Sequence, residues 1–227
     1  MHTARLALWA ISLALQCSLL AILVLRRSAR RLPVFTLLIA FYIVRSVALF
    51  VLPGHLKPAS FAQLFDLFSL VDVLLQLAVA GEIAFAAARQ YGDAERDRLS
   101  RVLLLLLAGV LAAVLATALM PSRGPAPVDR GSVLAAFLML LLWLWMTVER
   151  RGGPARRVVE GFAAYGVVAI VSNVIHNQTA LHRNEGVFRA ASWAQSVVYV
   201  LVVVVWCLTL RGADSTVAEP QGARAQA

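Results

Sequence analysis

The stretch FTLLIAFYIVRSVALFVL, residues 35–52, decides the fold because it is apolar almost throughout and yet carries Arg45 well inside it. A helix of roughly 20 apolar residues crosses the ~30 Å hydrocarbon core of a bilayer. A charged side chain at that depth is costly, and such residues face the bundle interior or water and pair with one another. The stretch therefore predicts a membrane span and a partner for Arg45.

The composition extends this prediction to the whole chain. Of the 227 residues, 61% are hydrophobic, which excludes an ordinary soluble domain. We expect an all-α, polytopic membrane bundle of seven transmembrane helices forming one domain over residues 1–210. The small, polar remainder, 211–227, is expected to be a disordered cytoplasmic tail. The expected spans are residues 5–25, 33–53, 61–88, 100–120, 131–149, 157–180 and 187–210.

The distribution of positive charge predicts the orientation. Of the 21 basic residues, 14 flank one set of alternating helix ends, in clusters such as 26–31 and 150–157, and six flank the other set. Arg45 alone belongs to neither. The positive-inside rule then places the N-terminus outside and the C-terminus in the cytoplasm, in a membrane of the bacterial inner-membrane type. The net charge of +9 is thus explained without a nucleic-acid partner.

Two aspartates on the next helix are candidate partners for Arg45. At 1.5 Å per residue, Arg45 lies about 12 Å from the outer end of its span, Asp66 about 8 Å and Asp72 about 17 Å. An ion pair between Arg45 and either aspartate would compensate both charges. Tyr42 lies one turn deeper on a similar face and is expected to hydrogen-bond Asp72. The spacing leaves open whether the pair is structural or functional.

Polar side chains recur at three- and four-residue spacing on the first, third, sixth and seventh spans, so each set shares one helix face. Their convergence would form an outward-facing polar pocket. The alternative is that they only hydrogen-bond neighbouring helices together. The candidates for this ligand pocket or polar network are Tyr42, Arg45, Asp66, Asp72, Gln76, Asn173, His176, Asn177, Gln195, Ser196 and Tyr199.

The sequence predicts no catalytic residue, cofactor or metal site. A bilayer haem takes two axial ligands and a catalytic zinc takes three protein ligands, whereas His176 is the one histidine placed well inside a span. Asp66 and Asp72 lie about 120° apart around their helix, which is poor geometry for a shared proton. Glu82, near the cytoplasmic end of its span, is expected to meet Arg31 or solvent.

These observations favour a non-enzymatic small-ligand sensor or binding component. Its expected partners are the lipid bilayer, a small-molecule or lipid ligand and a cytoplasmic protein, because the inner loops are too short to signal alone. The alternatives are an intramembrane lipid-modifying enzyme that uses Asp66 or Asp72, and a small transporter.

Short motifs in the second and third spans carry a family resemblance. They are PVF at 33–35, FYIVR at 41–45, the aspartates, and Gly81-Glu82-Ile83. Over these two spans the chain resembles functionally uncharacterised seven-helix integral membrane proteins of bacteria. The resemblance implies the same helical layout and no particular activity.

Overall fold

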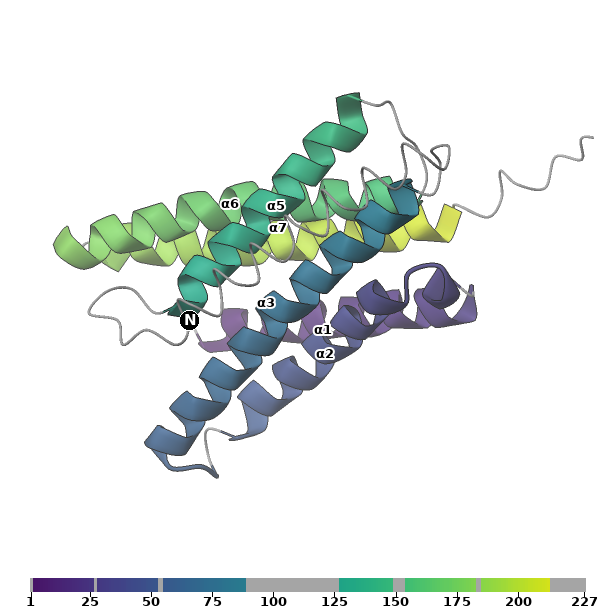
Figure 1. The fold of residues 1–227 in the computed structure, drawn as a ribbon. Coiled ribbons are helices and arrows are strands. Elements are labelled where there is room, and N and C mark those ends of the chain that lie inside the picture. The colour runs from purple at the N-terminus through teal and green to yellow at the C-terminus, as the bar shows by residue number, and fades with distance from the viewer. Residues whose placement is uncertain are drawn as a thin grey trace, which may run out of the picture.

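The computed structural model describes residues 2–26, 28–52, 55–88, 127–148, 154–182 and 185–212, and within them the regular structure is helical throughout (Figure 1). The predicted span at 100–120 and most of the predicted tail lie outside the described residues. The helices are α1 (His2–Leu25), η1 (Ser28–Arg30, a 3-10 turn), α2 (Pro33–Val51), α3 (Pro58–Ala88), α5 (Pro127–Val148), α6 (Pro154–His182) and α7 (Glu185–Gly212).

Prolines begin four of these helices, at Pro33, Pro58, Pro127 and Pro154. Proline suits the first helical position, because its fixed φ matches the helix and its missing N–H has no intrahelical acceptor there. This explains why α3, α5 and α6 begin three or four residues before their expected starts. The apolar pattern marks where the hydrocarbon begins, whereas the helix begins one polar turn earlier.

The prediction of a multi-pass, all-α membrane protein is confirmed by helix length and hydropathy. Within the described residues, α5 contributes a shorter apolar helix, Ala135–Thr147. Large apolar side chains such as Leu25, Val44 and Leu208 are exposed on the bundle, as expected of surfaces that contact lipid. The segments long and apolar enough to cross a membrane are Leu6–Leu25, Pro33–Val51, Pro58–Ala86, Ala155–Ile175 and Glu185–Arg211.

The six long helices of the described residues form a closed ring. α1 packs against α2 and α7, α6 packs against α7 and α5, and α3 completes the ring by contacting α5 and α2. At one end of the ring the core is aromatic. The Phe35 ring meets the Trp206 ring edge-on with centroids 5.2 Å apart, and Phe162 packs against Trp206 at 4.9 Å. The Trp206 indole N–H donates to the carbonyl of Arg157 at 3.1 Å.

Gly161 allows this close approach of α6 to α7. A Cβ at this position would lie 2.4 Å from Nε1 of Trp206, closer than real side chains approach. Gly166, one turn and a half along the same helix, has more room, because its Cβ would lie 3.2 Å from Cβ of Ala136. Alanine substitutions at the two glycines can therefore be compared, one with little space for a methyl group and one with more.

We expect Gly161→Ala to destabilise the protein, because the rigid, hydrogen-bonded indole must move to admit a methyl group. Overpacking of this kind typically costs about 1–3 kcal/mol. Thermal unfolding of the purified protein in detergent measures the effect, with Gly166→Ala as the matched control. Equal melting temperatures for the two variants would contradict the role given to Gly161.

Candidate functional site

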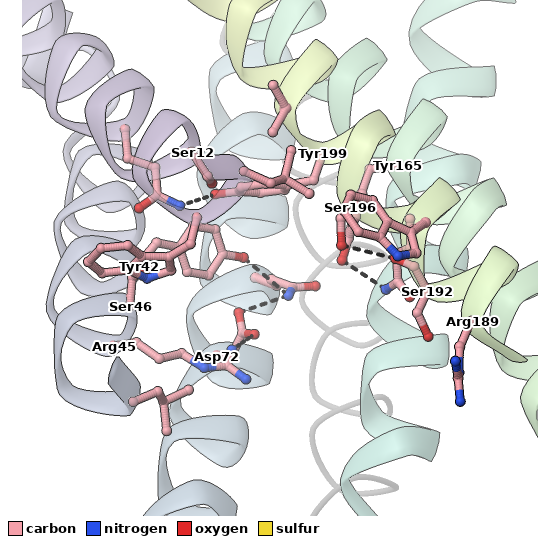
Figure 2. Close-up of a pocket in the computed structure, with 18 of the residues that line it drawn as sticks. Ser12, Tyr42, Arg45, Ser46, Asp72, Tyr165, Arg189, Ser192, Ser196 and Tyr199 are labelled. Atoms are coloured by element: carbon pink, nitrogen blue, oxygen red, sulfur yellow. Dashed lines mark hydrogen bonds and ion pairs between the residues drawn. The ribbon is translucent and has the colours of Figure 1, made fainter. Parts of the chain in front are cut away.

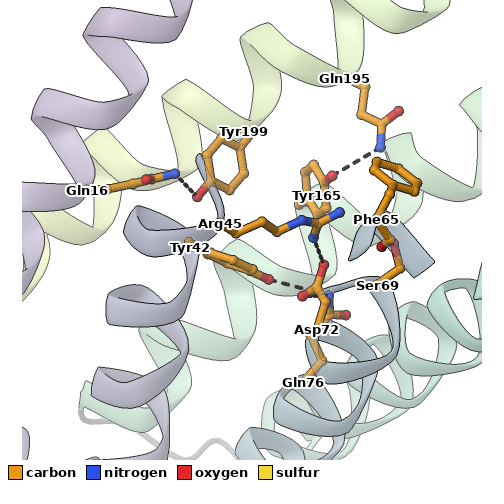
Figure 3. Close-up of polar contacts among 10 residues, drawn as sticks. All are labelled: Gln16, Tyr42, Arg45, Phe65, Ser69, Asp72, Gln76, Tyr165, Gln195 and Tyr199. Atoms are coloured by element: carbon orange, nitrogen blue, oxygen red, sulfur yellow. Dashed lines mark hydrogen bonds and ion pairs between the residues drawn. The ribbon is translucent and has the colours of Figure 1, made fainter. Parts of the chain in front are cut away.

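Arg45 of α2 forms an ion pair with Asp72 of α3, with 2.5 Å between Nη1 and Oδ2 (Figure 3). The two side chains are 22% and 16% exposed, so the pair is largely removed from solvent. Asp66, the other candidate, is exposed and forms no ion pair with any described residue. Asp66 lies about 120° around α3 from Asp72. When Asp72 faces α2, Asp66 therefore points away from it. The Phe65 ring covers the guanidinium at 6.0 Å from Cζ.

Gln76, one turn along α3 from Asp72, adds a hydrogen bond to the ion pair. Its Nε2 donates to Oδ1 of Asp72 at 2.9 Å and contacts the hydroxyl of Tyr42 at 3.4 Å. The predicted hydrogen bond between the Tyr42 hydroxyl and the Asp72 carboxylate is also present, so Tyr42 and Gln76 contact the same aspartate. Both carboxylate oxygens of Asp72 consequently accept hydrogen bonds, one from Arg45 and one from Gln76.

Two further glutamine–tyrosine pairs join other helices of the ring. Nε2 of Gln16 on α1 donates to the hydroxyl of Tyr199 on α7 at 2.7 Å, and Nε2 of Gln195 on α7 donates to the hydroxyl of Tyr165 on α6 at 3.0 Å. The Tyr199 ring meets Tyr165 and Tyr42 edge-on, with centroids 5.7 and 6.2 Å away. Polar contacts therefore connect α1, α7 and α6, and separately α2 and α3.

A cavity of about 620 Å³ lies between these side chains (Figure 2). Its volume is within the range of small-ligand sites, which combine apolar and aromatic walls with a few polar groups. The polar part of the wall is formed by Ser12, Gln16, Tyr42, Arg45, Ser46, Asp72, Gln76, Tyr165, Arg189, Ser192, Gln195, Ser196 and Tyr199. The apolar part is formed by Leu8, Trp9, Leu49, Phe188, Trp193 and Val200.

The structure brings most of the candidate residues together, while a role in ligand binding stays a prediction for all of them. Asp66 and Asn173 do not line the cavity, and the side chains of His176 and Asn177 lie outside the described residues. The hydroxyl of Ser172, in the same polar stripe of α6, is buried 3.5 Å from the carbonyl of Ala191 on α7. The candidates that line the cavity are Tyr42, Arg45, Asp72, Gln76, Gln195, Ser196 and Tyr199.

Tyr165 is the lining residue from α6 that the sequence reasoning missed. It sits in the run FAAYGVVAIV, where its neighbours are small or apolar and no polar spacing draws attention to it. The available signal is its position seven residues before Ser172, which places both on one face of α6. The polar stripe on that face thus extends two turns deeper than predicted.

Glu82 caps the start of α2 from the neighbouring helix. In place of the expected contact with Arg31 or solvent, its two carboxylate oxygens accept the backbone N–H groups of Val34 and Phe35 at 2.9 and 3.0 Å. The first turn of a helix has N–H groups without intrahelical acceptors, and the residue before this helix, Leu32, supplies no side-chain cap. A carboxylate at this end also interacts favourably with the helix dipole.

Comparison of the chain with protein-family models, curated proteins and solved structures returned no significant match. The resemblance carried by the second and third spans therefore stays a prediction. In the described part of the chain, no group of three or more His, Cys, Asp or Glu side chains is placed to hold a metal ion.

We expect Arg45→Gln and Asp72→Asn each to lower the melting temperature, because each leaves an opposite charge unpaired inside the bundle. The double variant should lose less than the sum of the two, since it leaves no net charge behind. A coupling of about 0.5–3 kcal/mol is typical of residues in direct contact, and the partial exposure of this pair favours the lower part of that range.

A double-mutant cycle in detergent, measured by thermal or denaturant unfolding, gives this coupling. Asp66→Asn is the matched control, since it removes an exposed carboxylate from the same helix and should change stability little. Strictly additive losses at Arg45 and Asp72 would show that the pair does not stabilise the bundle.

Proposed function

We propose that this multi-pass membrane protein has seven spans, with its N-terminus outside the cell and its C-terminus in the cytoplasm of a bacterium, and that it binds a small ligand between its helices. The observation that carries the proposal is the cavity around Arg45, lined from α1, α2, α3, α6 and α7. The cavity lies toward the N-terminal end of α1, which the proposed orientation places on the outer side. Binding from outside suits a sensor or binding component that acts through a cytoplasmic protein partner.

The alternative of an intramembrane lipid hydrolase needs a carboxylate able to exchange protons with a substrate. Both oxygens of Asp72 already accept hydrogen bonds from protein donors, and Asp66 does not line the cavity. Ligand binding uses the same wall without requiring either group to be freed. Nothing in the arrangement favours the third candidate, a transporter, over binding.

The orientation can be tested with reporter fusions in a bacterial host. Alkaline phosphatase folds to an active enzyme outside the cytoplasm, so a fusion at Gly124 should be active, whereas fusions at Gly152 and after Ala227 should be inactive. A fluorescent protein fused after Ala227 should be bright. An active phosphatase after Ala227 would reverse the proposed orientation.

Ligand binding can be tested by filling the cavity from α1. Ser12 lines the cavity, whereas Ser18 on the same helix is exposed and outside it. We expect some compounds in a panel of small anionic, cationic and neutral molecules to raise the melting temperature of the unmodified protein and of Ser18→Phe. A ligand at about 100 times its Kd stabilises the folded state by about 2.7 kcal/mol, which a melting curve detects.

The same compounds should leave Ser12→Phe unchanged, because the added ring occupies their space. If no compound stabilises the unmodified protein, or if Ser12→Phe responds as Ser18→Phe does, the cavity is not a binding site.

A further inference from the structure

We infer that the cavity selects an organic anion: a ligand with a carboxylate or similar oxyanion on an apolar or aromatic body. This inference rests on the proposed ligand-binding function and names the chemistry of the ligand. It follows from the balance of hydrogen-bond donors, acceptors and charges in the wall.

Arg45 supplies the unused donors. A guanidinium carries several N–H groups in a planar fork that fits a carboxylate, and it has no acceptor of its own. Within the described part of the chain, Asp72 is the one residue that accepts a hydrogen bond from it. The guanidinium extends from α2 between Asp72 and Tyr165, and Arg45 lines the cavity (Figure 3). Its remaining N–H groups are available to a ligand there.

Two tyrosines add neutral donors on the opposite wall. The hydroxyls of Tyr165 and Tyr199 each accept an N–H from a glutamine, so their own hydrogens must point elsewhere. Among the residues that the structure describes, neither hydroxyl donates to a protein acceptor. These two hydroxyls and the Arg45 guanidinium come from three different helices and line the same space.

The one carboxylate among the described lining residues is already hydrogen-bonded, which disfavours a cationic ligand. Asp72 is the one acidic residue among the described lining residues, and both its oxygens are taken. The wall also holds a second cation, Arg189, whose partner Glu185 at 2.7 Å lies outside the lining set. Each of the two cations is thus paired with one carboxylate, and the preference for an anion rests on the remaining N–H donors of the guanidinium groups.

The apolar side chains of the wall indicate that the rest of the ligand is apolar or aromatic. Leu8, Leu49 and Val200, with Trp9 and Trp193, offer apolar and aromatic surface. Gln16 provides one specific requirement, because its Oε1 is buried and accepts no hydrogen bond from any residue that the structure describes. Because a buried polar atom without a partner is destabilising, a ligand hydroxyl or N–H at this point would be stabilised. The chemistry fits either a soluble aryl carboxylate or a membrane-derived fatty acid.

The inference can be tested by calorimetric titration of the full chain in uncharged detergent. Three soluble probes share one body and differ in charge: 3-phenylpropionate, 3-phenylpropionamide and 3-phenylpropylamine. We expect the carboxylate to bind at least about tenfold more tightly than the amide, a difference of about 1.4 kcal/mol, and the amine to bind most weakly. Dodecanoate, titrated below its micelle concentration, separates a lipid source from a soluble one by which anion binds more tightly.

The variants locate the selectivity at Arg45. Asp72→Asn should bind the carboxylate more tightly than the unmodified protein does, because the guanidinium loses its competing partner. The double variant Arg45→Gln/Asp72→Asn, which leaves no charge unpaired, should bind carboxylate and amide equally. Lys57→Gln, which removes an exposed positive charge from the connection before α3, is the matched control and should retain the preference.

The outcomes separate this inference from the proposed function. If the amide or the amine binds as tightly as the carboxylate, and Ser12→Phe abolishes that binding, the protein binds small ligands but does not select anions. If the preference persists in the double variant, Arg45 is not its source and the inference is wrong. If no probe binds and the wider panel also fails to stabilise the protein, the proposed function fails with it.

Discussion

A positive charge inside hydrocarbon must be compensated, and the arrangement around Arg45 follows from that constraint. The guanidinium requires a carboxylate from the adjacent antiparallel helix, and Asp72 occupies the matching depth and face. The second carboxylate oxygen of Asp72 accepts a hydrogen bond from Gln76, and the same Gln76 amide contacts the hydroxyl of Tyr42. One charge on α2 thereby determines the polar face of α3 and one wall of the cavity.

The glutamine–tyrosine pairs connect the remaining helices without further charges. Side-chain hydrogen bonds between membrane helices contribute about 0.6 kcal/mol each on average, so these pairs add modestly to stability. Their effect lies in specificity, since Gln16 with Tyr199 and Gln195 with Tyr165 favour particular neighbours in the ring. The aromatic core of Phe35, Phe162 and Trp206 supplies tight apolar packing at the other end of the bundle.

The sequence predicted a multi-pass helical membrane protein because hydropathy reports directly on the length of chain that can cross the hydrocarbon. The described residues contain five long apolar helices, and the count of seven spans stays a prediction. The sequence also limited the partner of Arg45 to Asp66 or Asp72, and could not choose because depth does not specify rotation about the helix axis. The sequence did not predict Tyr165 as a lining residue because it is an isolated tyrosine in an apolar run, without nearby polar residues at helical spacing. The capping role of Glu82 depends on which helix end lies opposite, and this is a property of the packed bundle.

α3 is attached to α2 at two points along its length: Glu82 accepts hydrogen bonds from the first turn of α2, and Asp72 forms the ion pair with Arg45. Eleven residues separate Val34 from Arg45 along α2, and ten separate Asp72 from Glu82 along α3, so the two attachments span nearly equal lengths of antiparallel helix. Two attachments at matched separation oppose sliding of one helix past the other, whereas a single attachment would act as a pivot. The hairpin of α2 and α3 is thus held together at two points along its length. We expect a displacement at Arg45 to be transmitted to Phe35 and the start of α2, at the other end of the same helix.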